Sequence, residues 1–319
     1  MRVLLLAFMM GLGFSAYAEE FNKNCSMGMA MGMEVATDCS VRWENAGKTY
    51  CFSSPEAKDQ FLMSKDENLR KAESFEQKMM SKKADQPQEK ISTERAREML
   101  KQATADKLAD FSGKDLSYQD LSGLDLRHAK FVDTNLFGAD LRGSNLSGTD
   151  MTNAYLNLAR IENANFSNAN LTDATIFQPI FDKNNFKGAK LVNARVIGTL
   201  GAVDMSEADI RKGRFGLDIG NQPMGQMKFD SVGGKFAGSN FEGADINRAN
   251  LSFADLRGAN LRGTNLFRVD FSKADMTGAD LTGADVGEAI FDGTVMKDVK
   301  GWDKVKGMDT IKGKCDGCK

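Results

Sequence analysis

The chain has 319 residues, of which 27% are charged and 41% hydrophobic, and its formal net charge is −2. Nearly balanced charge gives no reason to expect binding to nucleic acid or to an anionic membrane surface. His128 is the single histidine, and the sequence contains neither a glycine-rich phosphate loop before a helix nor a nucleophile elbow. We therefore expect no enzyme.

The first 18 residues have the pattern of a secretory signal peptide. Arg2 precedes an apolar run that reaches Phe14, and small residues at Ala16 and Ala18 come just before Glu19. The apolar run is too short to span a bilayer. We expect cleavage after Ala18 and a periplasmic or secreted protein, with an uncleaved anchor as the less favoured alternative. No later stretch predicts a membrane span.

Residues 19–80 form a separate segment that holds most of the sulfur. In an extended chain, methionines at every second position project their thioethers to one side, which suits a soft ion such as Cu(I). The alternative is that these methionines fill a core, since methionine adapts to irregular spaces. The hypothetical copper ligands are Cys25, Met27, Met29, Met31 and Met33, with Cys39 and Cys51 as further candidates.

Two stretches of this segment resemble the YHS family of small metal-associated modules. They are Asn24-Cys25-Ser26-Met27 and the run from Gly47 to Leu62, which contains Gly-Lys-Thr-Tyr-Cys-Phe. The resemblance implies a small α+β domain. Ser53 and Ala57 stand where the family carries paired cysteines, and neither side chain binds soft metals as a thiolate does. The family's metal site is therefore degraded in this chain.

Helix signals follow the sulfur-rich stretch. Ser54 can cap a helix that starts at Pro55, with Glu56 near its positive end. Residues 81–91 are polar and predict a linker. Residues 92–107 predict an amphipathic helix that covers the open first coil of the repeats that follow, because an exposed coil end invites edge pairing.

From residue 108 to 296 the chain repeats a five-residue motif. A large apolar residue recurs at every fifth position from Phe111 to Val196 and again from Phe236 to Met296, with a small residue two positions before most of them. An α-helix would rotate these residues by about 140° per repeat and spread them around its circumference. A flat strand would turn every second one to solvent. A chain that turns a corner at each repeat keeps all of them inside, which predicts a solenoid.

These residues resemble the pentapeptide-repeat family. The resemblance implies an all-β solenoid, a right-handed quadrilateral β-helix with four repeats per coil. Some members are acidic enough to imitate DNA, but the charge of this chain is mixed, so we expect no nucleic-acid partner. Because some members dock end to end, a homodimer is a further expectation.

Residues 197–235 are predicted to interrupt the repeat. Insertions in a solenoid emerge on one side, often the binding side. Arg211, Lys212 and Arg214 place three positive charges in this stretch and are candidates for a partner loop; an ordinary solvated loop is the favoured alternative.

Residues 297–319 predict a C-terminal cap that ends in Cys315 and Cys318. A local disulfide between these two cysteines is favoured over a redox or metal site, because no helix follows them. Five cysteines leave at least one without an intramolecular partner.

Two functional hypotheses remain. The first is an exported, non-enzymatic interaction or scaffold protein that binds an unidentified protein partner. The second is a periplasmic copper-binding protein that uses the N-terminal cysteines and methionines.

Overall fold

The computed structural model describes residues 25–31, 37, 39–45, 48–73, 88–177, 183–216 and 228–317. The chain divides into two compact units, Met1–Pro87 and Gln88–Lys319. Among the helices in the described ranges, none is both long and apolar enough to cross a bilayer.

The N-terminal unit is a small α+β arrangement. Helix α1 (Ser26–Ala30) precedes the antiparallel strands β1 (Val41–Asn45) and β2 (Lys48–Phe52), which are followed by helix α2 (Pro55–Met63). A further helix starts at residue 65 and continues at least to residue 73. Its core contains Cys25, Met29, Tyr50, Phe52, Phe61 and Ala72.

Helix α2 begins where the sequence predicts. The Ser54 hydroxyl accepts a hydrogen bond from the Ala57 N–H at 3.2 Å, and Pro55 occupies the first turn, where its missing N–H leaves no bond unmade. The chain leaves helical geometry at Ser64, so that α2 and the following helix are two elements.

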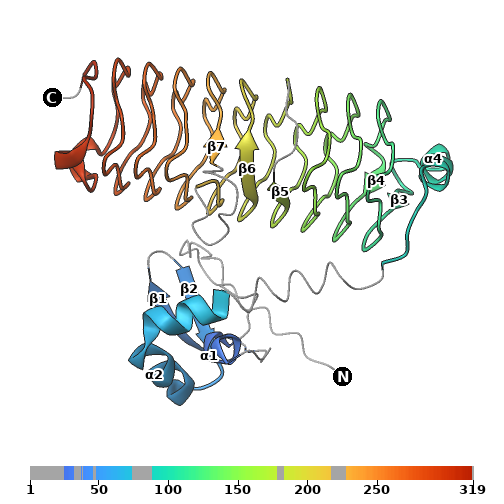
Figure 1. Ribbon diagram of the computed structural model, residues 1–319, viewed down its shortest axis with the longest axis horizontal. Helices are drawn as coiled ribbons and strands as arrows, with labels where there is room; N and C mark the ends of the chain where they lie inside the picture. The colour runs from blue at the N-terminus through green and yellow to red at the C-terminus, as the bar shows by residue number, and fades with distance from the viewer. Residues whose placement is uncertain are drawn as a thin grey trace, which may run out of the picture. The chain divides into compact units, whose positions relative to one another are not determined.

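The second unit is a solenoid in which successive coils pair in parallel (Figure 1). Bridges join residues 20 positions apart, as in the series Asp115, Asn135, Tyr155. Twenty residues hold four five-residue repeats, so each coil has four sides. The short strands are β3 (Ala109–Asp110) with β4 (Ala129–Lys130), and β5 (Thr175–Phe177), β6 (Arg195–Thr199) and β7 (Phe229–Asp230) in one parallel group.

The repeat centres form the core. Leu116, Leu136 and Leu156 are fully buried, as are most of the alanines two positions before a centre. At most of the described corners the chain turns with a residue of positive φ two positions after a centre, such as Gly113 (φ 66°) or Asn153 (φ 57°). Glycine and asparagine tolerate this conformation best, which explains their frequency there.

The predicted interruption over 197–235 is wrong for its first half. Asn185, Lys190 and Arg195 bridge to Asp204, Asp209 and Arg214, which are 19 positions away rather than 20. One coil is a single residue shorter than the others, and this shift puts the following repeats out of phase in the sequence. Asp204 then pairs with Lys235, 31 positions away, and the residues that account for the extra length include 217–227, which lie outside the described ranges.

The start of the solenoid is covered. The Asp115 N–H donates to the Glu89 carbonyl at 3.0 Å, and the Ile91 N–H donates to the Asp115 carbonyl at 2.9 Å, so residues 88–91 belong to the solenoid edge and not to a linker. Helix α4 (Thr93–Lys101) follows and is shorter than the predicted 92–107. Its buried Ala96, with Met99 and Leu100, packs against the solenoid core at one end of the coil stack (Figure 1).

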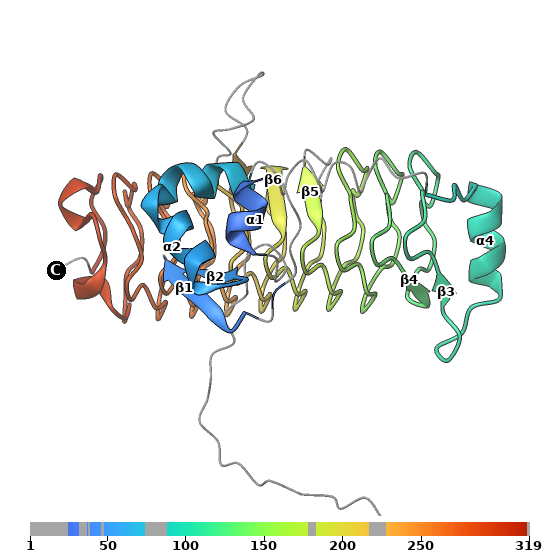
Figure 2. The same ribbon diagram turned by 90° about the horizontal axis from the view of Figure 1, so that it is seen from below.

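At the other end the coils continue beyond the predicted limit of residue 296. Lys300, Lys306, Lys312 and Asp316 each pair with the preceding coil. Two short 3-10 helices, η2 (Trp302–Lys304) and η3 (Met308–Thr310), interrupt this last coil (Figure 2). Val299, Trp302, Val305 and Ile311 are half-buried against the core, so this segment closes the solenoid with a coil of its own.

Candidate functional site

The N-terminal methionines do not form the expected one-sided array. Ser26–Ala30 is the helix α1, in which successive residues are about 100° apart and not on alternate faces. Met29 is 2% exposed and lies in the core, whereas Met31, just after the helix, is 61% exposed. Met27 is partly buried against the same core, and Met33 lies outside the described residues. The prediction of an extended methionine strand is wrong.

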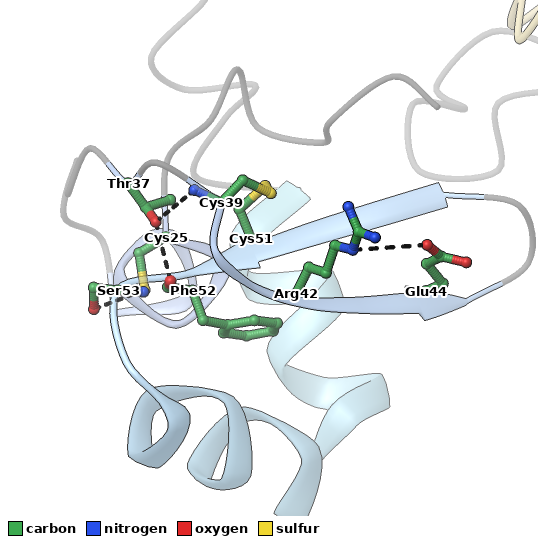
Figure 3. The surroundings of a disulfide bond; sticks show 8 residues. All are labelled: Cys25, Thr37, Cys39, Arg42, Glu44, Cys51, Phe52 and Ser53. Atoms are coloured by element: carbon green, nitrogen blue, oxygen red, sulfur yellow. Dashed lines mark hydrogen bonds and ion pairs between the residues drawn. A yellow bond between two sulfur atoms is a disulfide. The ribbon is translucent and has the colours of Figure 1, made fainter. Parts of the chain in front are cut away.

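Cys39 and Cys51 form a disulfide, with their Cα atoms 4.7 Å apart (Figure 3). A sulfur in a disulfide is no thiolate, so the proposed role of these two cysteines as metal ligands is incompatible with this bonded state. Within the described ranges, no group of three or more His, Cys, Asp or Glu side chains is placed to hold a metal ion. In the described part of the chain, therefore, no geometric observation favours a copper site.

Cys25 is a buried free thiol whose surroundings favour the thiolate. Its sulfur accepts hydrogen bonds from the Ser53 N–H at 3.3 Å and from the Ser53 hydroxyl at 3.4 Å (Figure 3). Burial raises the pKa of Cys25, but hydrogen bonds from Ser53 and from the backbone of Gly28 and Met27 outweigh it and hold the pKa below 9.0. Ser53, one of the two positions singled out by the YHS resemblance, thus contacts Cys25 directly.

The three cations of the predicted partner loop lie on a regular coil. Arg211 is held by Asp209, with 2.7 Å between its Nη2 and the Asp209 Oδ2. Lys212 occupies a corner with φ 57°, and Arg214 is an exposed residue that bridges to Arg195 and Asp245. Arg211 and Arg214 flank a corner and belong to adjacent sides, so they do not form one loop cluster. Their role in partner binding stays a prediction.

At the C-terminus, Cys315 is disulfide-bonded and partly buried against the solenoid core. Cys318 lies outside the described residues.

One side of the solenoid carries a series of aromatic and apolar side chains at outward positions. This side, here called the aromatic side, has the centres Leu116, Leu136, Leu156 and Ile176, and it includes strands β5 and β6 in Figure 1. Its outward apolar residues are Tyr118, Phe137, Tyr155, Leu158 and Phe177. In the sequence, the aromatic side is marked by bulky residues at outward positions where most repeats have Ser, Thr, Asn, Asp or Gly. That these residues lie on one side follows only from the length of the coil, which is 20 residues.

The aromatic residues contact one another from coil to coil. The ring centroids of Tyr118 and Phe137 are 5.4 Å apart, and those of Phe137 and Tyr155 are 6.1 Å apart with planes inclined by 13°. The Arg195 guanidinium lies 5.0 Å from the Phe177 ring centre on the next coil. The contacts join Tyr118, Phe137 and Tyr155 in one row along the solenoid axis, and the Phe177–Arg195 pair extends this row on the following coils.

The pentapeptide-repeat family model matches the chain in eight copies over residues 109–148, 134–173, 233–263 and 259–298. Comparison with curated proteins gave no match. The repeat region of this chain therefore belongs to the pentapeptide-repeat family.

Several solved structures are similar to the chain. HetL, a pentapeptide repeat protein of heterocyst differentiation regulation from the cyanobacterium Nostoc, is 24% identical over 64% of this chain and 82% of its own, with a TM-score of 0.23. Full-length QnrB1, a plasmid-mediated fluoroquinolone resistance protein, is 15% identical over 62% and 92%, with a TM-score of 0.26. A pentapeptide repeat protein from the Arabidopsis thaliana thylakoid lumen is 26% identical over 36% and 66%, with a TM-score of 0.18.

Proposed function

We propose that this chain is an exported, non-enzymatic protein whose pentapeptide-repeat solenoid presents a rigid surface to a protein partner. The observation that carries the proposal is the separation between core and surface. The buried centres and the coil-to-coil hydrogen bonds hold the backbone, for example 2.9 Å from the Tyr118 N–H to the Phe137 carbonyl. Outward side chains are then free to be selected for recognition.

Exposed apolar residues at outward positions favour recognition over a passive spacer. Tyr118 is 69% exposed and Phe253 57% exposed, and both have φ of 60°. A bulky residue is unfavourable in this left-handed conformation, and an exposed ring gains little from burial to offset that cost. A spacer would use glycine or asparagine at such corners.

The proposal is tested by site-specific photocrosslinking in the native cell. A photoreactive residue replaces Phe137, Arg142, Ser147 or Thr152, which follow four successive centres and so sample all four sides of the solenoid. A discrete protein adduct from at least one side supports the proposal. Full-length exported protein without a specific adduct from any side would contradict it.

Export is tested separately by sequencing the N-terminus of the protein recovered from the periplasm or the medium. The signal peptide predicts a mature chain that starts at Glu19. Recovery of the chain with Met1 intact in the cytoplasmic fraction would reject export and leave the scaffold proposal standing.

A further inference from the structure

On the aromatic side, the row of apolar residues is followed along the solenoid axis by arginines. Beyond Phe177 and Arg195, Arg214 and then Arg248 occupy outward positions on the next coils of the same side. Among the described residues, neither Arg214 nor Arg248 has a carboxylate within ion-pair distance. Arg211, Arg257 and Arg142 on other sides are each held by an aspartate two positions earlier.

Negative charge is absent from the middle of this side. Between Asn135 and Arg214, its described outward positions carry no Asp or Glu. The other three sides carry Asp140, Asp150 and Asp204 in the same stretch of coils. The side therefore presents an apolar strip that leads to two arginines, Arg214 and Arg248, with one carboxylate, Asp245, between them. Because positive charge is in excess there, the complement of this side is an apolar group next to carboxylates.

The exposed apolar residues sit where the backbone disfavours them. Tyr118 and Leu158 both have positive φ, and Leu158 is 45% exposed. Gly138 leaves space for the Tyr118 ring, because a Cβ there would come within 2.8 Å of it. Two bulky apolar residues kept at such corners of one side point to a selected surface.

We infer that the aromatic side binds an extended acidic protein segment, with its apolar side chains on the Tyr118–Phe177 strip and its carboxylates toward Arg214 and Arg248. This inference rests on the proposed interaction function and specifies its surface. From Tyr118 to Arg214 the side crosses five coil spacings of ~4.8 Å, or ~24 Å, which about seven extended residues can follow.

The ring geometry favours a protein segment over a single-stranded nucleic acid. Binding of bases uses successive open aromatic faces. Phe137 and Tyr155 stack on each other, and Phe177 is covered by Arg195, so these faces are already engaged. Ring edges and the Leu158 side chain suit contacts with aliphatic or aromatic side chains of a peptide.

The test uses the full mature chain as bait for a random twelve-residue peptide library displayed on phage, followed by fluorescence anisotropy of the selected peptides. A labelled oligothymidylate is the nucleic-acid probe. The expected peptides combine Leu, Phe, Tyr or Trp with Asp or Glu, and oligothymidylate does not bind. Binding of oligothymidylate to the aromatic side, or a peptide pool without acidic and apolar enrichment, would overturn the inference.

The substitutions introduce residues that occur at the same positions in other repeats of this chain, so that the fold is kept. Tyr118→Asn, Phe137→Ser and Tyr155→Asn each introduce a residue that other repeats use at the same position. The triple variant is expected to weaken the selected peptides by more than ~10-fold. Arg214→Asn with Arg248→Asn is expected to weaken them ~3- to 10-fold at low salt, and less at high salt.

Phe253→Asn is the matched control, because Phe253 is an exposed aromatic corner residue on another side, where Lys273 lies 5.1 Å from its ring centre. It is expected to leave peptide binding unchanged. Equal loss in Phe253→Asn and in the triple variant would reject the assignment to the aromatic side. If crosslinks in the cell come only from other sides, this inference fails while the proposed function stands.

Discussion

The hydroxyl of Thr134 donates a hydrogen bond of 2.8 Å to the carbonyl oxygen of Phe111 in the preceding coil. Thr134 is fully buried and stands at the position where most repeats have alanine. The same bond joins Thr264 to Phe241 and Thr294 to Phe271. A buried hydroxyl is tolerated there because it is satisfied by a carbonyl one coil away.

Thr134→Val is expected to lower the free energy of unfolding by ~1–2 kcal/mol, because it replaces a satisfied hydroxyl by a methyl group against a carbonyl. Thr134→Ala is expected to cost less, since the Phe111 carbonyl also accepts from the Lys114 N–H at 3.0 Å. Denaturant unfolding followed by circular dichroism measures both values. A Thr134→Val variant as stable as the parent protein would contradict the role of the hydroxyl.

Acid is expected to weaken the solenoid through its Asp–Arg pairs. Hydrogen bonds from Arg127 lower the pKa of Asp125 from 3.8 to about 2, and hydrogen bonds from Arg142 lower that of Asp140. A carboxyl group whose pKa is lower in the folded than in the unfolded protein stabilises the folded state at pH values above its unfolded-state pKa. This contribution is lost as the pH falls through the folded-state pKa. Stability should therefore decrease from pH 3.8 toward about 2.

Asp140→Asn tests this at the more buried pair, where Arg160 also lies 3.3 Å from the carboxylate. We expect a loss of ~1 kcal/mol at neutral pH and a smaller stability change on acidification. Asp292→Asn, an exposed aspartate on the same solenoid, controls for the change of net charge. An Asp140→Asn curve parallel to that of the parent protein down to pH 2 would count against the pairing.

The pKa of Cys25 is expected to rise when Ser53 is replaced by alanine, because the thiolate loses the hydroxyl donor while the Ser53 backbone donor remains. The measurement is ultraviolet absorbance of the thiolate against pH, in a background with Cys315→Ser and Cys318→Ser. Cys25→Ser in that background gives the baseline. An unchanged titration in Ser53→Ala would show that the hydroxyl does not act on the thiolate.

Helix α4 is expected to keep the first coil from pairing with other chains. Ala96→Asp places a carboxylate at a fully buried contact with the core, and it should detach the helix and produce concentration-dependent association. Light scattering coupled to size-exclusion chromatography measures the mass. Ala96→Gly lowers helix propensity by ~1 kcal/mol without a buried charge and should stay closer to the parent.

The local predictions that succeed are those where a few neighbouring residues decide the geometry. Ser54 and Pro55 start α2 through their own side chains, and the five-residue period of Leu116 and Leu136 defines the core. The prediction of a methionine array fails because residues at alternate positions share one face only in an extended strand. Ser26–Ala30 is instead a helix that packs in one core with Phe52 and Phe61. The predicted interruption fails before Asp204, because a closed coil accommodates the loss of one residue.

The amino-acid sequence by itself determined the solenoid, because one inward apolar residue in every five can be buried in no other regular backbone. Only the tertiary structure decided which outward residues meet, since neighbours on the surface are 20 positions apart in most coils and, for example, 19, 22 or 31 around the irregular ones. Tyr118, Phe137, Tyr155 and Phe177 are scattered along the chain and become one strip through that coil length. The pairing of Cys39 with Cys51 likewise depends on the β1–β2 hairpin, and the place of Ser53 beside Cys25 depends on how α1 packs next to the end of β2.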